Sequence, residues 1–240
     1  MDKLIYTVMT GAERAFHAQQ VHANNLANAD TQGFRADYEV ASAQAVQGYG
    51  YDTRHQSVGA TDAVVQRSGT VTTTGRSLDV AIRGEGYLAV RFGDGEAYTR
   101  AGAMELDANG ALSIHGRPVM GDGGPIVLPP HRAVSIASDG TISVLPEDGQ
   151  DMQEVDRLKL VQGQGAVTKN AAGLIVARDG NPLPASETVR LQGQALEGSN
   201  VRAVEEMVAV MDVSRQFEIQ MKLFQAADSM VDAGNRLVRD

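Results

Sequence analysis

The 240-residue chain has no cysteine and no tryptophan, and it contains only five phenylalanines and six tyrosines. Without cysteine it forms no disulfide, no thiolate metal site and no cysteine nucleophile, although this does not fix its compartment. Large aromatic anchors are few while glycine is abundant, at 26 residues. This composition predicts a turn-rich β region in a folded, globular chain.

The chain also lacks an excess of positive charge and any long apolar run. Its 21 Lys and Arg against 30 Asp and Glu give a net charge of -9, which argues against nucleic acid or an anionic membrane as the main partner. No window reaches the roughly 18 consecutive apolar residues of a membrane span. Residues 1–16 lack the cationic region and long apolar run of a cleaved secretion signal. We expect no nucleic-acid binding, no membrane insertion and, for any export, another route.

Motifs for cofactors or catalysis are few and weak. Gly84 and Gly86 match G-x-G-x-x-A, with Glu105 downstream, but residues 87–92 read as a strand where a dinucleotide site needs a helix. We therefore interpret the glycines as a hairpin turn. Asp107-Ala108-Asn109-Gly110 lacks the closing glutamate of a calcium loop and predicts an ordinary turn. The five histidines show no HExxH pattern, and no nucleophile elbow or phosphate loop is present. We expect no cofactor, no metal and no enzymatic activity, with a non-contiguous active site as a distant alternative.

The strongest helical pattern covers residues 200–238, which contain no proline and a single glycine, Gly234. Good helix formers dominate, Ser199 and Asn200 supply N-cap chemistry, and Glu205 and Glu206 favour the positive end of the helix dipole. A stripe follows the three-and-four steps of a coiled-coil seam. Its members are Met207, Val210, Ser214, Phe217, Met221, Phe224, Asp228, Val231, Asn235 and Val238.

The length of this segment implies a partner. A helix of this size is about 57 Å long, whereas a compact 240-residue domain has a radius of gyration of about 18 Å. Residues 3–27 supply a second helix with similar spacing, and we expect the two to bury each other's stripes. That N-terminal stripe consists of Ile5, Met9, Ala12, Phe16, Gln19, Ala23 and Leu26.

Between the helices the hydrophobic period changes. Residues 36–68 are small and polar and predict an extended connector, with at most one short strand. From residue 69 onwards, short Val-, Ile- and Leu-rich runs alternate with Gly-, Asp- and Asn-rich turns, which predicts antiparallel β structure. The predicted fold class is α+β: long terminal helices packed as a coiled-coil-like domain (1–35 with 198–240) and a mainly antiparallel β middle domain (69–197).

The first helix ends in an Asn-rich segment that by itself predicts a cap and a turn. Its Asn24, Asn25, Ala27, Asn28, Thr31, Gly33, Phe34 and Arg35 nevertheless resemble the N-terminal signature of the flagellar rod, hook and hook-associated family. Residues 78–88, 98–102 and 110–112 are similar to that family's central series, and 196–201 and 205–208 to the start of its C-terminal helix.

This resemblance implies a structural subunit of the flagellar basal-body rod that polymerises through its terminal helices. It implies export by the flagellar type III apparatus, assembly in the periplasm, and contacts with copies of itself and with other proximal and distal rod proteins. Residues 197–201 and 215–218 are most similar to proximal-rod members, with a distal-rod protein as the alternative. A secreted binding module dimerised by its helices is the alternative from another class. The expected signature and assembly residues are Asn24, Asn25, Asn28, Thr31, Gly33, Phe34, Ser199, Asn200, Val201, Met207, Val210, Phe217, Met221, Phe224 and Val231.

Overall fold

The computed structural model describes the backbone of residues 2–45, 55–163 and 167–239. Within these ranges it describes the side chains of residues 9–38, 64–163, 167–230, 233 and 236. The chain divides into two compact units. The helical unit comprises Met1–Asn28, Asp37–Ala63 and Val201–Asp240, and the β-rich unit comprises Ala29–Ala36 and Val64–Asn200. Residues 29–35, which the sequence grouped with the helices, therefore fold with the β-rich unit.

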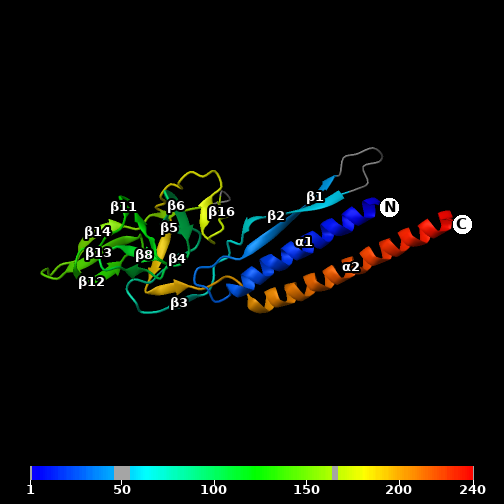
Figure 1. Cartoon of the computed structure of the whole chain (residues 1–240). Helices are drawn as coiled ribbons and strands as arrows, with labels where there is room; N and C mark the ends of the chain where they lie inside the picture. Colours follow the sequence, from blue (N-terminus) through cyan, green and yellow to red (C-terminus); the bar gives the residue numbers. More distant parts are fainter. Residues whose placement is uncertain (1, 46–54, 164–166, 240) are drawn as a thin grey trace. The chain divides into compact units, whose positions relative to one another are not determined.

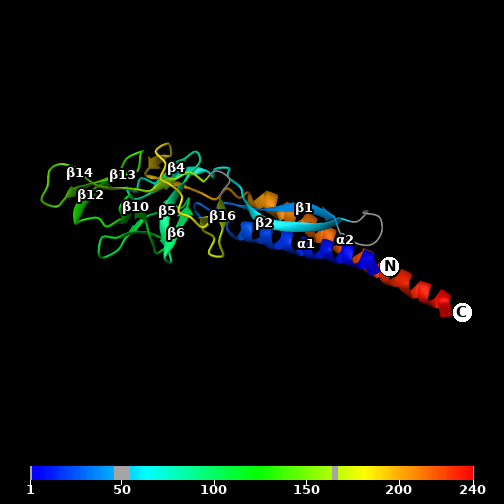
Figure 2. The ribbon, with the colours of Figure 1, turned by 90° about the horizontal axis from the view of Figure 1, so that it is seen from above.

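The helical unit is built on α1 (Asp2–Ala27) and α2 (Ala203–Arg239). Figures 1 and 2 both show the two helices side by side. They are antiparallel, because His22 of α1 contacts Glu206 of α2 while Gly11 lies beside Gln220. Two strands, β1 (Asp37–Ala45) and β2 (His55–Val64), pair with each other inside the stretch that the sequence predicted as an extended connector, and β1 contacts α1.

The predicted coiled-coil-like packing of these helices is wrong. Phe217 and Phe224, at the centre of the predicted seam, are 38% and 41% exposed. On α1, Met9 and Phe16 are more than half exposed. The described apolar side chains that the helices do bury are Ala15 and Val21 on α1 and Val213 and Ala227 on α2.

The error has a physical cause. At about 100° of rotation per residue, Met9 and Phe16 lie roughly opposite the side of α1 that Ala15 and Val21 define. Small residues let the helices approach closely: a Cβ on Gly11 would lie 3.0 Å from Nε2 of Gln220. Periodicity identifies residues that share a face, but it does not identify what covers that face.

The β-rich unit consists of short strands connected by tight turns (Figure 1). They are β3 (Val71–Thr73), β4 (Val80–Arg83), β5 (Tyr87–Phe92), β6 (Gly95–Thr99), β7 (Glu105–Leu106), β8 (Leu112–Ile114), β9 (Arg117–Pro118), β10 (Met120–Gly121), β11 (Gly124–Pro125), β12 (His131–Ile136), β13 (Thr141–Pro146), β14 (Gln153–Arg157), β15 (Leu160–Val161), β16 (Val167–Lys169), β17 (Ile175–Ala177), β18 (Arg190–Gly193) and β19 (Ala195–Glu197). The largest sheet has the order β15-β5-β6-β17-β16, and two three-stranded sheets have the orders β12-β13-β14 and β7-β8-β9. The described pairings in this unit are antiparallel, so a mostly β middle is observed.

Strand β5 lies between two apolar cores. Leu88 and Val90 belong to the larger core, whereas Tyr87 and Ala89 point to a smaller one on the other face. Burial on both faces explains why this strand reads as a continuous apolar run rather than an alternating one. The turn before it, at Gly84-Glu85-Gly86, is not the expected hairpin, because β4 pairs with β18 and β5 pairs with β6 and β15.

In the described part of the chain, neither helix carries an apolar stretch long enough to cross a membrane.

We predict that stability falls in alkaline solution because of buried tyrosines. Burial raises the pKa of Tyr87 and of Tyr98, whose hydroxyl accepts a hydrogen bond from the Leu183 amide at 2.6 Å. The unfolded chain releases these protons near pH 10 whereas the folded chain retains them, so the free energy of unfolding falls as pH rises above about 10. In urea titrations between pH 8 and 11, Tyr98→Phe should show a shallower decline than the parent. The exposed control Tyr38→Phe should keep the parental slope, and equal slopes in both variants would contradict the assignment.

Candidate functional site

Three segments of the β-rich unit meet where the chain passes to and from the helical unit. They are residues 33–36, 65–70 and 197–200, and we call them the junction. The Gly33 amide donates to the Glu197 carbonyl (2.8 Å), the Asn200 amide to Phe34 (3.2 Å), and the Gly198 amide to Thr70 (2.8 Å). These hydrogen bonds join positions far apart in the sequence. They also explain why the residues after α1 belong to the β-rich unit.

Asn200 connects all three segments through its side chain, which is buried (residue exposure 5%). Its Oδ1 accepts from the Ala36 amide at 2.7 Å, and its Nδ2 donates to the carbonyls of Val65 and Arg67, both at 2.9 Å. The sequence predicted an N-cap here, but α2 begins at Ala203 and the Asn200 side chain bonds to the junction instead. An asparagine amide suits this role because it offers both a donor and an acceptor, as a backbone peptide does.

A buried ionic group lies at the centre of the junction. The Glu197 carboxylate is fully buried, with Oε1 2.9 Å from Nη2 of Arg35 and Oε2 2.9 Å from Nη1 of Arg100. The Arg100 contact is a hydrogen bond, whereas the Arg35 contact has the distance of an ion pair without hydrogen-bond alignment. Oε1 also accepts from the Gly69 amide at 2.8 Å. One carboxylate thus links both arginines to the segment before β3.

Each arginine is tied further to main-chain carbonyls. Arg35 donates to Arg67, and Arg100 donates to Gly84 and, at 3.4 Å, to Ile82. Burial and then the neighbouring charge of Arg100 lower the pKa of Arg35, while Glu197 opposes this shift. Buried charges need such partners because an uncompensated one is strongly destabilising.

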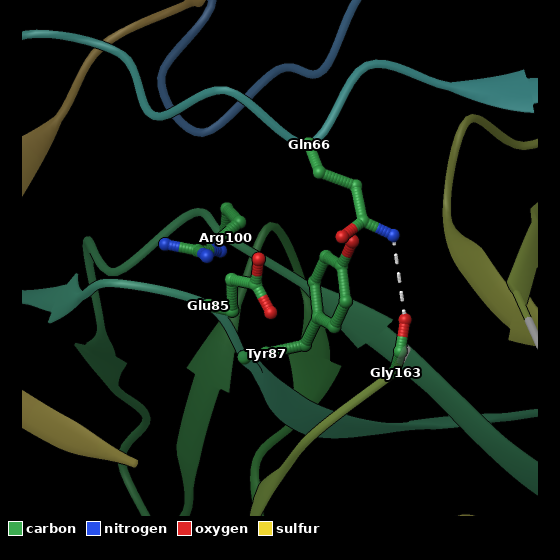
Figure 3. A pocket seen from close by; sticks show the side chains of 6 residues that line it. Gln66, Glu85, Tyr87, Arg100 and Gly163 are labelled. Atoms are coloured by element: carbon green, nitrogen blue, oxygen red, sulfur yellow. Dashed lines mark hydrogen bonds between the residues drawn. The ribbon is translucent and has the colours of Figure 1, made fainter. Parts of the chain in front are cut away.

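Figure 3 shows the other side of Arg100, where a small hollow is lined by Gln66, Glu85, Tyr87, Arg100 and Gly163. The Arg100 guanidinium lies over the Tyr87 ring, 5.5 Å from its centre. Gln66 donates to the Gly163 carbonyl at 3.5 Å across this hollow. The space holds about one water molecule. It is therefore too small for an organic substrate.

Gly33 and Phe34 have distinct packing roles in the junction. Gly33 has φ +67°, and a Cβ there would lie 2.1 Å from the Ala101 backbone nitrogen, so the close approach of these two backbone segments requires glycine. The Phe34 ring is half-buried beneath the Lys169 ammonium, 3.9 Å from the ring centre. Lys169 also donates to the Arg35 carbonyl at 2.7 Å. Of the other predicted signature residues near the junction, Thr31 is exposed, whereas Ser199 and Val201 are half-buried.

The asparagines of α1 make a second polar group, within the helical unit. Asn25 is buried, and its amide exchanges hydrogen bonds with the Asp37 backbone at 2.8 and 3.0 Å. It also donates to Glu206 at 3.4 Å, and Glu206 contacts His22 Nδ1 at 2.6 Å. Asn24 donates to the Asp37 carboxylate at 3.0 Å, and Asn28 donates back to the Asn24 carbonyl at 2.9 Å. These asparagines therefore fix contacts inside one chain.

The predicted assembly residues of α2 lie mostly in solvent. Met207, Phe217, Met221 and Phe224 are exposed, and Val210 is half-buried. The side chain of Val231 lies outside the described set. Exposed large apolar side chains gathered on one element are typical of an interaction surface.

Arg35, Arg100 and Glu197 lie in the stretches that resemble the flagellar family, but the sequence alone assigns them no structural role. The available signal was a charged residue inside an otherwise apolar or small-residue strand, as in Ala195-Leu196-Glu197. That pattern does not reveal which charges meet. In the described residues, no group of three or more His, Asp or Glu is placed to hold a metal ion.

Comparison with known proteins places three matches along the chain. The family description "Flagella basal body rod protein" matches residues 5–35, "Flagellar hook protein FlgE/F/G D1 domain" matches 81–144, and "Flagellar basal body rod FlgEFG protein C-terminal" matches 192–237. The flagellar basal-body rod protein FlgF of Escherichia coli is 40% identical over 99% of both chains, and that of Salmonella typhimurium is equally similar. The rod protein FlgG of Bacillus subtilis is 28% identical over 96% of this chain and 97% of its own.

We predict that Glu197→Gln destabilises the β-rich unit severely. The change leaves two buried guanidinium groups without their shared carboxylate, which costs about 3–5 kcal/mol in comparable buried pairs. Urea unfolding followed by circular dichroism measures the effect. The control Glu154→Gln, on an exposed position of β14, should change stability by less than about 0.5 kcal/mol. Similar stabilities for the two variants would show that the ionic group does not hold the junction.

Proposed function

Because the chain belongs to the FlgF family of flagellar basal-body rod proteins and is a structural subunit of that rod, we propose that it assembles through the exposed apolar faces of α1 and α2. The observation that carries this proposal is the concentration of solvent-exposed large apolar residues on the two helices. They are Met9, Phe16, Val204, Met207, Val208, Met211, Phe217, Ile219, Met221, Leu223, Phe224 and Met230.

These residues do not form one face. At about 100° per residue, Val204, Val208 and Met211 share one side of α2, whereas Phe217 and Phe224 share another, about 150° away. A single copy of a partner helix covers only one such side. The Phe217 and Phe224 side flanks the buried side of α2, since Val213 lies about 20° from Phe224, whereas the Val204 side is open. The two sides support contacts with more than one neighbouring subunit, as a head-to-tail helical assembly needs.

We propose that the subunits contacting these helices are other proteins of the flagellar rod. Family membership supports self-association and contacts with other rod proteins. The 40% identity to FlgF of Escherichia coli, against 28% to FlgG of Bacillus subtilis, supports a place in the proximal rather than the distal rod. On the same ground we propose a purely structural, non-enzymatic role, export by the flagellar type III apparatus, and assembly in the periplasm.

We predict that Phe224→Asp prevents incorporation into the rod while the isolated chain stays folded. Phe224 is 41% exposed, so its replacement costs the monomer less than a substitution in the core, but a carboxylate in an apolar contact between subunits must be desolvated without a partner. Complementation of a strain lacking the parent gene, scored by swimming and by immunodetection in purified basal bodies, measures assembly.

The matched control is Gln225→Asp, which adds the same charge at the adjacent exposed position. Gln225→Asp should swim and assemble nearly as the parent does. Circular dichroism of both purified variants separates loss of assembly from loss of folding. A motile Phe224→Asp strain with a normal amount of the protein in its basal bodies would show that this side of α2 makes no assembly contact.

A further inference from the structure

Methionine is the only sulfur-containing residue type in the chain, which has nine methionines and no cysteine. An oxidant that reacts with sulfur therefore meets thioethers alone, without a competing thiol. The methionines differ widely in their exposure to water. Met104 lies in the larger core of the β-rich unit and is fully buried, whereas Met207 and Met211 of α2 are 51% and 63% exposed. These two side chains are open to a small oxidant dissolved in water.

Met207 and Met211 belong to one group on α2. They are four positions apart, so they are neighbours on one side of the helix. Val204 and Val208, which are 74% and 47% exposed, extend the same side. The buried Val213 lies about 170° around the helix from the centre of this group, so the α1 contact does not cover it. We call Val204, Met207, Val208 and Met211 the methionine patch.

We propose that Met207 and Met211 are a modification site at which a peroxide forms methionine sulfoxide, and that this oxidation blocks the docking of a neighbouring rod subunit on the methionine patch. The block rests on the assembly contact proposed above. The modification itself does not, because it requires only that the two side chains be exposed in the single chain.

The reaction is a two-electron oxidation of each thioether by hydrogen peroxide. The sulfur lone pair attacks one peroxide oxygen, so an S–O bond forms as the O–O bond breaks. The second oxygen leaves as hydroxide and takes the proton of the attacked oxygen, which gives water. An apolar thioether is thus converted into a polar sulfoxide, a change that disrupts methionine-rich interfaces.

The modification acts on assembly rather than on folding. In the single chain both side chains are exposed, so water solvates the new oxygens. In an apolar contact between subunits, each sulfoxide oxygen is an acceptor that loses its water without gaining a donor. Two such oxygens on neighbouring positions of one patch weaken the contact together.

Mass spectrometry of the purified full chain after treatment with hydrogen peroxide tests the site. In the folded chain, Met207 and Met211 should gain oxygen more than about tenfold faster than Met104, because a buried sulfur reacts only when the structure opens locally. In concentrated urea the three should react at similar rates. Circular dichroism of the oxidised chain should show the parental helix content. Equal rates at Met104 and Met207 in the folded chain would overturn the site.

Two double variants, produced in a strain lacking the parent gene, test the block. Met207→Gln with Met211→Gln puts uncharged oxygen acceptors on the patch and should lower the amount of the protein in purified basal bodies about tenfold. Met207→Leu with Met211→Leu keeps the patch apolar and should assemble as the parent does. The control Met152→Gln makes the polar change at an exposed position of the β-rich unit and should also assemble normally.

Val208→Asp distinguishes this inference from the assembly contact on which it rests. If Val208→Asp assembles normally, the methionine patch makes no contact between subunits, and both the contact and the block are wrong. If Val208→Asp fails to assemble while the Gln double variant assembles as the parent does, the contact stands and the oxidation block alone is wrong. Failure of both variants, with the Leu double variant assembling normally, is the expected result.

Discussion

The Glu197 carboxylate is the group on which the rest of the β-rich unit's organisation depends. It is fully buried and accepts from Arg100 and the Gly69 amide while pairing with Arg35, so it links residues that are more than 150 positions apart in the chain. Directional bonds of this kind specify one arrangement of the segments, whereas apolar contacts tolerate sliding. The buried Asn200 amide reinforces the same geometry with three further hydrogen bonds. Together they fix the spacing of the three segments through which the chain passes between its units.

Much of the fold follows from the sequence because its causes are local. The change of hydrophobic period separates helical ends from a β middle, and Gly33 in the Asn-rich segment does mark a backbone position that only glycine fills easily. The prediction of coiled-coil-like packing was wrong because each helix carries apolar residues on more than one side. Spacing alone does not say which side faces the partner helix. The role of Asn200 was missed for a related reason: its polar side chain near a helix start predicts a cap, but its actual partners, Ala36, Val65 and Arg67, are distant in sequence.

The contact between α1 and α2 is made by small and polar residues. Ala15, Val21 and Asn25 are buried on α1, and Gln220 and Glu206 of α2 approach the Gly11 and His22 regions. Such side chains bury little apolar surface, so this contact contributes less stability than a leucine-rich seam of the same length. The larger apolar residues stay exposed in the single chain. If the rod assembles through these faces, as proposed, assembly and full stabilisation of the helices are one event.

The two units use polar and apolar side chains differently. In the β-rich unit, apolar residues form the core and a buried ionic group joins the segments of the junction. In the helical unit, polar residues such as His22, Asn25 and Glu206 fix the pairing within the chain, while large apolar residues stay exposed. If the apolar stripes had faced each other inside the monomer, the helix pair would have been more stable in the single chain. It would then have presented less apolar surface to other subunits. In the proposed assembly, the polar helix contact is therefore what keeps the apolar faces available to neighbouring subunits.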